Sequence, residues 1–199
     1  QTLSFADLDR LSGDFAAWIQ HETDLEPGDR IAIQLPNLLQ FPVAVFGALR
    51  AGLVVVNTNP LYTEREMAHQ FKDSNAKAIL ILANMASKLE KVLDKTEIKH
   101  VLVTQLADLH GAPKRWLINT VVKHVKKMVP AYSLPSALSF RSALQLISAK
   151  TQVISPWRSL WWLCQAEGVH MEMRQSVGPA GAQRIWDRDM SANTGRSYT

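Results

Sequence analysis

One stretch of the chain, residues 30–67, restricts the possible folds most strongly. It begins with a β-rich run at residues 30–35, which a Pro-Asn pair ends. Residues 38–51 then carry apolar side chains nearly all round, and this pattern predicts a well-buried helix. Gly52 follows at the position where helices commonly end.

The same stretch continues with a second strand and the start of a second helix. Residues 53–56 form a short apolar run, which is typical of a parallel strand covered on both faces. After a turn, Thr63 and Glu66 have the S/T-x-x-E spacing of a capping box, which predicts a helix N-terminus. A strand–helix–strand unit of this kind crosses over right-handed in nearly all known sheets.

Strands and helices alternate on both sides of this unit. Apolar spacing predicts helices at residues 6–20, 64–73 and 85–93, and strands at residues 77–82 and 100–104. Because the links between them are short, the pattern favours a parallel sheet with helices on both faces. The sequence therefore predicts an α/β fold.

Composition excludes several classes of protein. No apolar run approaches the length of about 18–20 residues that spans a bilayer, and no charged segment precedes an apolar one as in a signal peptide. Cys164 is the single cysteine, which excludes an internal disulfide and fits a reducing compartment. A net charge of +4 is mild, and no aromatic-interleaved basic patch indicates nucleic acid. The chain begins with Gln1 rather than Met, so we expect a longer protein.

Four sequence words in the first three quarters of the chain resemble a known family. They are PGDRIAIQLPN, FPVAVFGALRAG, VVVNTNPLYT and REMAHQF. They are similar to the N-terminal subdomain of bacterial long-chain fatty-acid–CoA ligases, which belong to the AMP-forming adenylating superfamily. The later word VVKHVKKMVPAYSLP is similar to the fatty-acid enzymes of proteobacterial type. The resemblance covers about residues 3–146.

The resemblance implies a two-step reaction for the complete protein. The carboxylate of a fatty acid would attack the α-phosphate of ATP, and the thiol of coenzyme A would then attack the acyl-adenylate. It implies ATP, Mg²⁺ and coenzyme A as cofactors, a fatty acid as substrate, and work in the cytoplasm at the inner face of the membrane. It also leaves open a ligase of the same superfamily that acts on aromatic or short-chain acids.

The motifs that would carry this chemistry are absent from the 199 residues. In the family, a loop reading roughly Y-T-G-G-T-T-G-x-A-K-G cradles the triphosphate through backbone N–H groups. The closing run around Thr194 and Gly195 lacks its further glycines and its lysine. The histidines have no zinc-ligand spacing, and Glu64 and Glu66 fit a helix cap better than an acid/base pair. We therefore predict no catalytic, cofactor-binding or metal residue here, and no acyl-adenylate formation by this chain alone.

Two clusters are candidates for contact with other molecules. Asn57, Asn59 and Tyr62 follow a predicted strand at the edge where open α/β sheets place ligands, although ordinary turn chemistry is the simpler interpretation. Residues 113–130 predict a basic amphipathic helix, which either packs on the sheet or lies on an anionic membrane or partner. Its cations are Lys114, Arg115, Lys123, Lys126 and Lys127, and its apolar stripe is Trp116, Leu117, Val121, Val125 and Met128.

The end of the chain differs in composition from the rest. Residues 151–199 contain no lysine, five arginines and four of the six tryptophans, with poor periodicity. This composition is typical of a GC-rich gene read out of frame, and a divergent natural tail is the alternative. We divide the chain into a partial ligase subdomain at residues 1–146 and an atypical, poorly ordered tail at residues 147–199.

Overall fold

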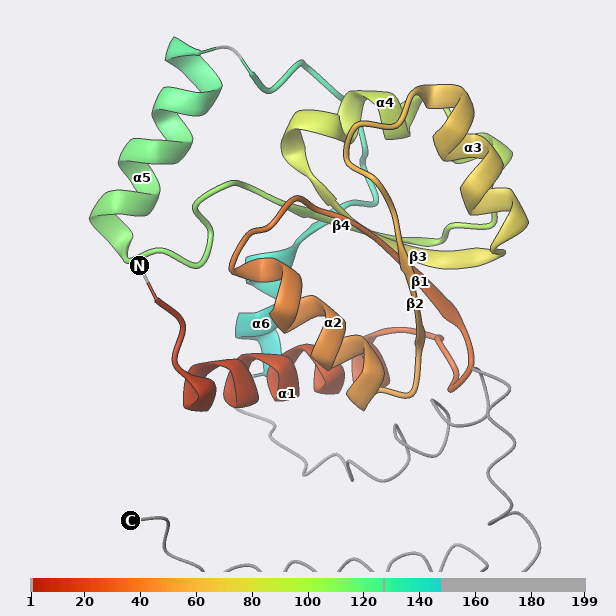
Figure 1. Ribbon diagram of the computed structural model, residues 1–199, viewed down its shortest axis with the longest axis horizontal. Coiled ribbons are helices and arrows are strands. Elements are labelled where there is room, and N and C mark those ends of the chain that lie inside the picture. The colour runs from red at the N-terminus through yellow and green to blue at the C-terminus, as the bar shows by residue number, and fades with distance from the viewer. Residues whose placement is uncertain (1, 127, 148–199) are drawn as a thin grey trace, which may run out of the picture. The chain divides into compact units, whose positions relative to one another are not determined.

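The computed structural model describes residues 2–126 and 128–147, and Figure 1 shows its ribbon. At the centre of this part lies a five-stranded sheet in the order β2-β1-β3-β4-β5, with every neighbouring pair parallel. This confirms the parallel sheet expected from the sequence. The strands are β1 (Arg30–Gln34), β2 (Val54–Asn57), β3 (Ala76–Leu82), β4 (His100–Thr104) and β5 (Leu138–Ser139).

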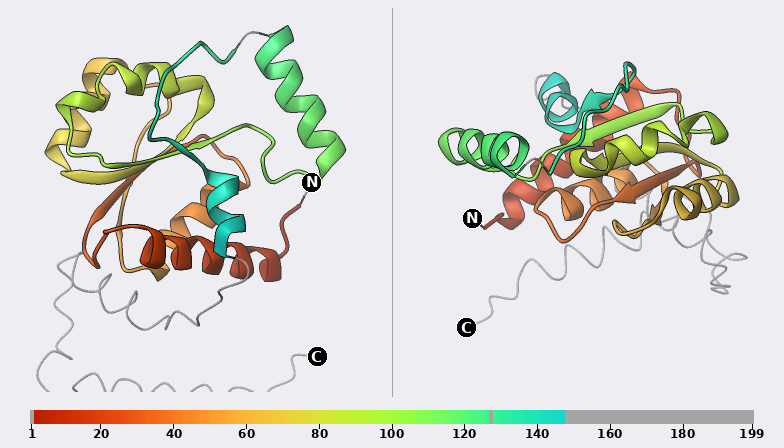
Figure 2. Two further views of the ribbon diagram at one scale, coloured as in Figure 1. Left: turned by 180° about the vertical axis from the view of Figure 1, so that it is seen from behind. Right: turned by 90° about the horizontal axis from the view of Figure 1, so that it is seen from above.

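Helices cover both faces of the sheet, as the views in Figures 1 and 2 show. The α-helices are α1 (Phe5–Glu22), α2 (Gln40–Arg50), α3 (Glu64–Asp73), α4 (Ala86–Glu90), α5 (Ala112–Thr120) and α6 (Phe140–Ile147). Three shorter segments join them, namely the 3₁₀ turns η1 (Ala83–Met85) and η2 (Leu93–Lys95) and the π-helical η3 (Val121–Val125). Helices α1, α2 and α6 lie on one face, and α3 and α4 lie on the other.

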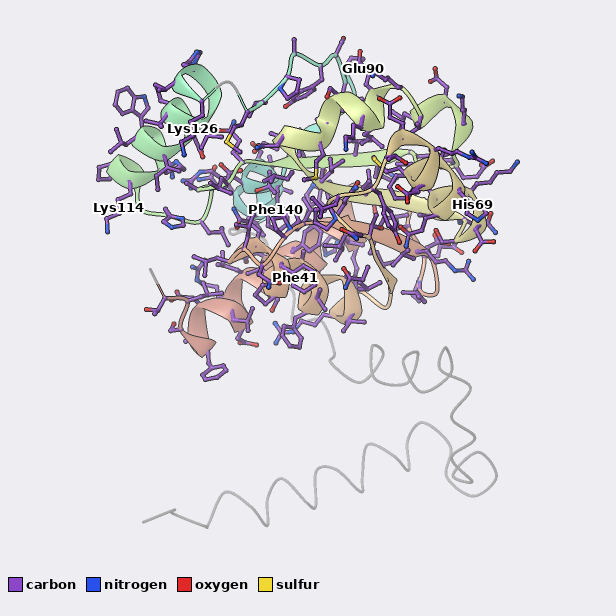
Figure 3. The ribbon with its side chains drawn as sticks, turned by 45° about the horizontal axis from the view of Figure 1, so that its top comes forward. Phe41, His69, Glu90, Lys114, Lys126 and Phe140 are labelled. Carbon is purple, nitrogen blue, oxygen red and sulfur yellow. The ribbon has the colours of Figure 1, made fainter. Side chains whose placement is uncertain are left out.

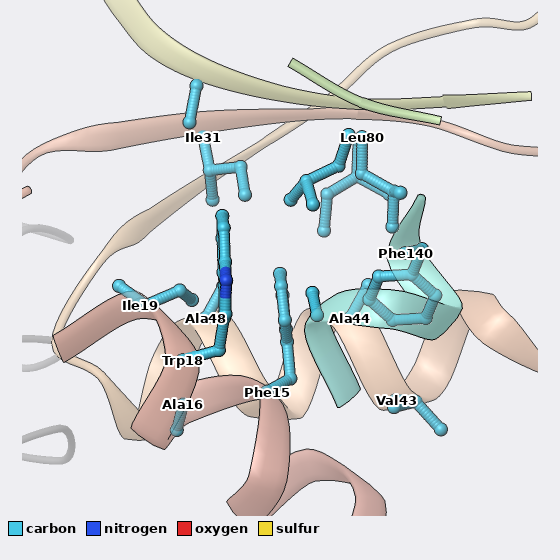
Figure 4. Packing of buried hydrophobic residues seen from close by; sticks show 14 of the residues in the cluster. Phe15, Ala16, Trp18, Ile19, Ile31, Val43, Ala44, Ala48, Leu80 and Phe140 are labelled. Carbon is cyan, nitrogen blue, oxygen red and sulfur yellow. The ribbon is translucent and has the colours of Figure 1, made fainter. Parts of the chain in front are cut away.

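Aromatic packing holds α1 and α6 to the first face. The Phe15 ring stacks beside Trp18 at 6.0 Å and meets Phe140 edge to face at 5.0 Å, and all three side chains are buried (Figure 4). Both arrangements are favoured by the ring quadrupole. Ile31 and Leu80 of the sheet close this core from above. The first face is therefore a continuous hydrophobic core that joins residues more than a hundred positions apart.

The second face has its own hydrophobic core. Met67 and Phe71 of α3 and Leu89 of α4 are fully buried. They belong to one cluster with Ile79 and Ile81, which alternate along β3 with the residues of the first face. A central strand buried on both faces explains the nearly continuous apolar run of β3.

Local signals read from the sequence define several element ends. The Thr63–Glu66 capping box is present, with the Thr63 N–H donating to Glu66 Oε2 at 2.8 Å. Gly52 ends α2 with φ of +86°, a conformation that costs little without a Cβ. Gly28, in the turn before β1, also has a positive φ, and its N–H donates to the Gly52 carbonyl at 2.8 Å.

The structure corrects three of the expected elements and adds a fourth that was not expected. Strand β2 is half-buried rather than covered on both faces, because it lies at the edge of the sheet. The helix expected at residues 85–93 is broken, with α4 ending at Glu90. The helix expected at residues 113–130 is divided into α5 and η3 and ends at Val125. The two-residue strand β5 was not predicted, because no sequence pattern indicates it. From residue 148 on, the predicted tail lies outside the described residues. The boundary between the ligase subdomain and the tail, placed at residues 146 and 147, therefore stays a prediction.

Candidate functional site

The parallel sheet brings the carboxyl ends of its strands to one edge. The strand order reverses its direction beside β1, since β2 lies on one side of it and β3 on the other. In open α/β sheets, ligands bind outside the carboxyl ends of the strands at such a reversal. The reversal lies between β1 and β3, and the segment after β2 adjoins the end of β1 at the same edge, so the carboxyl edge around β1 is where a ligand site is expected.

A groove of about 640 Å³ lies at this edge, and we call it the β1/β2 groove. It contains the three residues that the sequence singled out, Asn57, Asn59 and Tyr62. The structure thus brings the three together, and their role toward a ligand stays a prediction. The groove is lined by Leu35, Pro36, Asn37, Phe41, Asn57, Thr58, Asn59, Pro60, Leu61 and Tyr62.

Many hydrogen-bonding groups of these residues are used within the turn itself. The Asn59 side-chain oxygen accepts from the Leu61 N–H at 2.9 Å, and the Asn59 carbonyl accepts from the Tyr62 N–H at 3.2 Å. The Tyr62 carbonyl accepts from Lys88 Nζ at 3.0 Å. These bonds are ordinary Asx-turn chemistry reinforced by α4.

Gln34 supports the groove from beneath and was not singled out by the sequence. Its side chain is fully buried, and its Nε2 donates to the Asn59 carbonyl at 3.1 Å. Among the described residues, its Oε1 has no hydrogen-bond partner. A buried amide oxygen prefers a donor, so this atom is a position where a water or a ligand donor would be stabilised.

A second groove of about 430 Å³ adjoins the first through Asn37 and Phe41. Apolar side chains dominate it, and His110 contributes a buried Nδ1 that has no partner within the described part of the chain. The remaining lining residues are Leu38, Leu39, Pro42 and Leu106. Phe41, labelled in Figure 3, belongs to the first turn of α2.

The acidic residues near this edge have structural partners. Hydrogen bonds from Thr63, first from its backbone N–H, lower the pKa of the Glu66 carboxyl. Glu64 forms an ion pair with Lys91 at 2.6 Å. These contacts support the capping interpretation of the two glutamates over an acid/base pair.

None of the residues that line the two grooves belongs to the basic segment at residues 113–130. Lys114 and Lys126 are exposed at its two ends, and Arg115 is half-buried (Figure 3). The side chain of Lys123 and all of Lys127 lie outside the described residues. Of the expected apolar stripe, Val121 is half-buried, whereas the other four residues are exposed: Trp116 70%, Leu117 57%, Val125 72% and Met128 52%.

The described residues contain neither a metal-binding cluster nor a membrane-spanning helix. No group of three or more His, Cys, Asp or Glu side chains there could hold a metal ion. None of the helices in this part of the chain combines the length and the apolarity that crossing a bilayer requires.

Comparison with known families decides the assignment of the fold. The model of the AMP-binding enzyme family matches residues 1–151.

The chain belongs to the AMP-binding enzyme family.

Long-chain-fatty-acid–CoA ligases are among the most similar relatives in this family. The ligase of Escherichia coli O157:H7 is 53% identical over 144 residues, which is 72% of this chain and 26% of that protein. The ligase of Haemophilus influenzae is 52% identical over 146 residues, or 73% of this chain and 26% of that protein. The chain therefore spans about a quarter of the length of these relatives.

Solved structures of a CoA synthetase and a CoA ligase share the fold. Acetoacetyl-CoA synthetase from Streptomyces lividans has a TM-score of 0.57 at 15% identity, over 77% of this chain and 21% of that one. A benzoate CoA ligase from Burkholderia xenovorans has a TM-score of 0.52 at 20% identity, over 71% and 23%. At these identities the likeness concerns the fold alone.

Proposed function

We propose that the protein containing this chain activates long-chain fatty acids by converting them to coenzyme A thioesters. The observation that carries the proposal is the 53% identity over 144 residues to a long-chain-fatty-acid–CoA ligase. Because the match covers only 26% of that relative, the activity of the whole protein stays a proposal.

The proposed reaction has two balanced steps. A fatty-acid carboxylate attacks the α-phosphate of ATP, which forms acyl-adenylate and releases pyrophosphate. The thiol of coenzyme A then attacks the acyl carbon, which forms the thioester and releases AMP. Mg²⁺ would neutralise the triphosphate charge during the first step.

The present chain would supply scaffold rather than catalytic groups. Its 199 residues lack the Gly/Thr-rich phosphate loop, so we expect no acyl-adenylate from the chain alone and no strong binding of ATP, Mg²⁺ or coenzyme A. Losing a single preorganised donor can cost a factor of about 10²–10³ in rate. An ATP–pyrophosphate exchange assay with a long-chain fatty acid tests this, and turnover above background would contradict it.

A graft tests the ligase proposal directly. Residues 3–146 would replace the matching segment of the Escherichia coli ligase, to which the chain is 53% identical. We expect the graft to keep long-chain thioester formation, because the replaced segment would fold into the same sheet. A folded graft without this activity would refute the proposal.

A panel of acids distinguishes the substrate classes. A salicyl-AMP ligase of Mycobacterium tuberculosis is 39% identical over 108 residues, compared with 53% over 144 residues for the long-chain ligase of Escherichia coli O157:H7. We therefore expect the protein that contains this chain to prefer a long-chain fatty acid over benzoate and acetate. A preference for benzoate would instead favour the aromatic-acid branch.

We also propose that the protein works in the cytoplasm and associates peripherally with the inner face of the membrane. The single cysteine fits a reducing compartment, and a long-chain fatty acid partitions into bilayers, where an enzyme would meet it. A second candidate function, binding a membrane or a partner without catalysis, is favoured by the exposed Trp116 and Leu117. Vesicle binding without any turnover in the graft would favour this second candidate.

A further inference from the structure

Helix α5, η3 and the residues just after η3 expose large apolar side chains together with cations. We call this set the α5 surface, and it comprises Lys114, Trp116, Leu117, Val125, Lys126 and Met128. In the part of the chain that the structure describes, no residue of α5 is fully buried. Figures 1 and 2 show α5 beyond the end of the sheet, away from the helices that cover its two faces.

The charged side chains in the sequence around the α5 surface are all positive. From Leu109 to Ile147 the sequence contains no aspartate or glutamate, and it contains four lysines and two arginines. Accordingly, no ion pair of Lys114, Arg115 or Lys126 is present among the described residues. Elsewhere, Arg50, Lys77 and Lys91 each pair with a carboxylate. Within the described residues, Lys114 and Lys126 of the α5 surface are therefore not paired with a carboxylate.

A hydrogen-bonded anchor fixes the orientation of the helix. The Asn119 side-chain oxygen accepts from the Ala107 N–H at 3.1 Å, and its Nδ2 donates to Asp108 Oδ1 at 3.3 Å. The buried Asp108 carboxylate also accepts from Thr104 Oγ1 at 3.0 Å and from the Gln105 N–H at 2.7 Å. Asn119 is therefore held against the loop after β4, while Trp116 and Leu117 are left exposed.

We infer that the α5 surface docks on an anionic lipid bilayer. Tryptophan and aliphatic side chains gain free energy by entering the region between headgroups and acyl chains, and flanking lysines pair with anionic headgroups. The phosphates of a nucleic acid would pair with the cations, but they would gain little binding energy from Leu117, Val125 or Met128. The inference rests on the peripheral location proposed above, but it does not depend on the ligase chemistry.

Vesicle co-sedimentation of the full 199-residue chain tests this assignment without ATP, fatty acid or coenzyme A. We expect binding to phosphatidylcholine vesicles that contain phosphatidylserine, weaker binding at high salt, and little binding to phosphatidylcholine alone. K114E/K126E should lower the partition coefficient at least about tenfold, since each cation near an anionic leaflet contributes about 1 kcal/mol. W116S should lower it about tenfold, because one large apolar side chain no longer enters the bilayer.

Matched variants separate this surface from a general effect of charge or hydrophobicity. K72E/K95E changes the net charge by the same amount on α3 and η2, and F5S removes another exposed aromatic side chain, 92% exposed at the start of α1. Both should bind as the unmodified chain does. Quenching of tryptophan fluorescence by brominated lipid should fall in W116F, which reports insertion independently of affinity.

Several results would overturn the assignment. One is vesicle binding that survives both W116S and K114E/K126E, and another is equal binding to vesicles with and without phosphatidylserine. A third is binding to poly(U) RNA without binding to vesicles, which would indicate a nucleic-acid partner. Loss of ligase activity in the graft would leave all of these readouts unchanged, so the two proposals fail separately.

Discussion

Gly47 of α2 lies directly against the ring of Phe15 in α1. A Cβ atom built on Gly47 would stand 2.7 Å from Phe15 Cδ1, 2.9 Å from Phe15 Cβ and 3.0 Å from the Ser12 carbonyl oxygen. Real side chains do not approach one another this closely, so the two helices can cross at this distance only because residue 47 has no side chain.

Gly47→Ala should therefore destabilise the protein. Overpacking a filled core costs about 1–3 kcal/mol, which exceeds the gain of up to about 1 kcal/mol in helix propensity. Urea unfolding measures the difference. Gly13→Ala in α1 is the matched control, because its Cβ would meet only Arg50 Nη1 at 3.5 Å. It should be neutral or stabilising, and equal losses in both variants would contradict the argument.

Thr63→Ala should lower stability by about 1 kcal/mol, since the N-cap hydroxyl of α3 accepts from the Glu66 N–H. Bonds from Thr63 lower the pKa of Glu66 below its ordinary value of 4.5, so this carboxylate stabilises the fold above that pH and loses its effect as the pH falls through its folded pKa. Thermal unfolding at several pH values measures both effects. Arg65→Ala, at an exposed position in the same turn, should change little.

Asp14 should oppose the fold increasingly as the pH rises. Burial raises the pKa of its carboxyl above the ordinary value of 3.8, and the Arg10 guanidinium, 3.5 Å away, offsets part of that shift. Between 3.8 and the raised pKa the folded state binds more protons than the unfolded state, so the contribution of Asp14 to stability falls through this window. The stability of Asp14→Asn relative to the unmodified chain should rise from about pH 3 to about pH 7. A flat or falling difference in urea unfolding would contradict this.

Asn119→Ala should loosen α5 without unfolding the sheet. The substitution removes two hydrogen bonds and leaves the Ala107 N–H and Asp108 Oδ1 without their partner, at a cost of about 1–3 kcal/mol. Hydrogen exchange should accelerate at the amides of α5 and remain slow in β3 and β4. His124→Ala, at an exposed position of η3, is the control and should leave both regions unchanged.

Local interactions explain what could be predicted for the candidate site. The turn that carries Asn59 and Tyr62 was identified because asparagine and proline favour turns within a few residues. Gln34 was missed because a glutamine inside a strand has no local pattern that distinguishes a buried amide from an exposed one. Its partner, the Asn59 carbonyl, is 25 positions away, and only the pairing of β1 with β2 brings them together.

The sequence by itself determined the α/β alternation, the capping box at Thr63 and Glu66, and the glycine end of α2 at Gly52, because each depends on neighbours within one or two helical turns. Only the tertiary structure decided that β2 is an edge strand, that β5 exists, and that Trp116 and Leu117 face outward. An amphipathic stripe marks one side of a helix, but what that side meets depends on contacts outside the helix, such as Asn119 with Asp108.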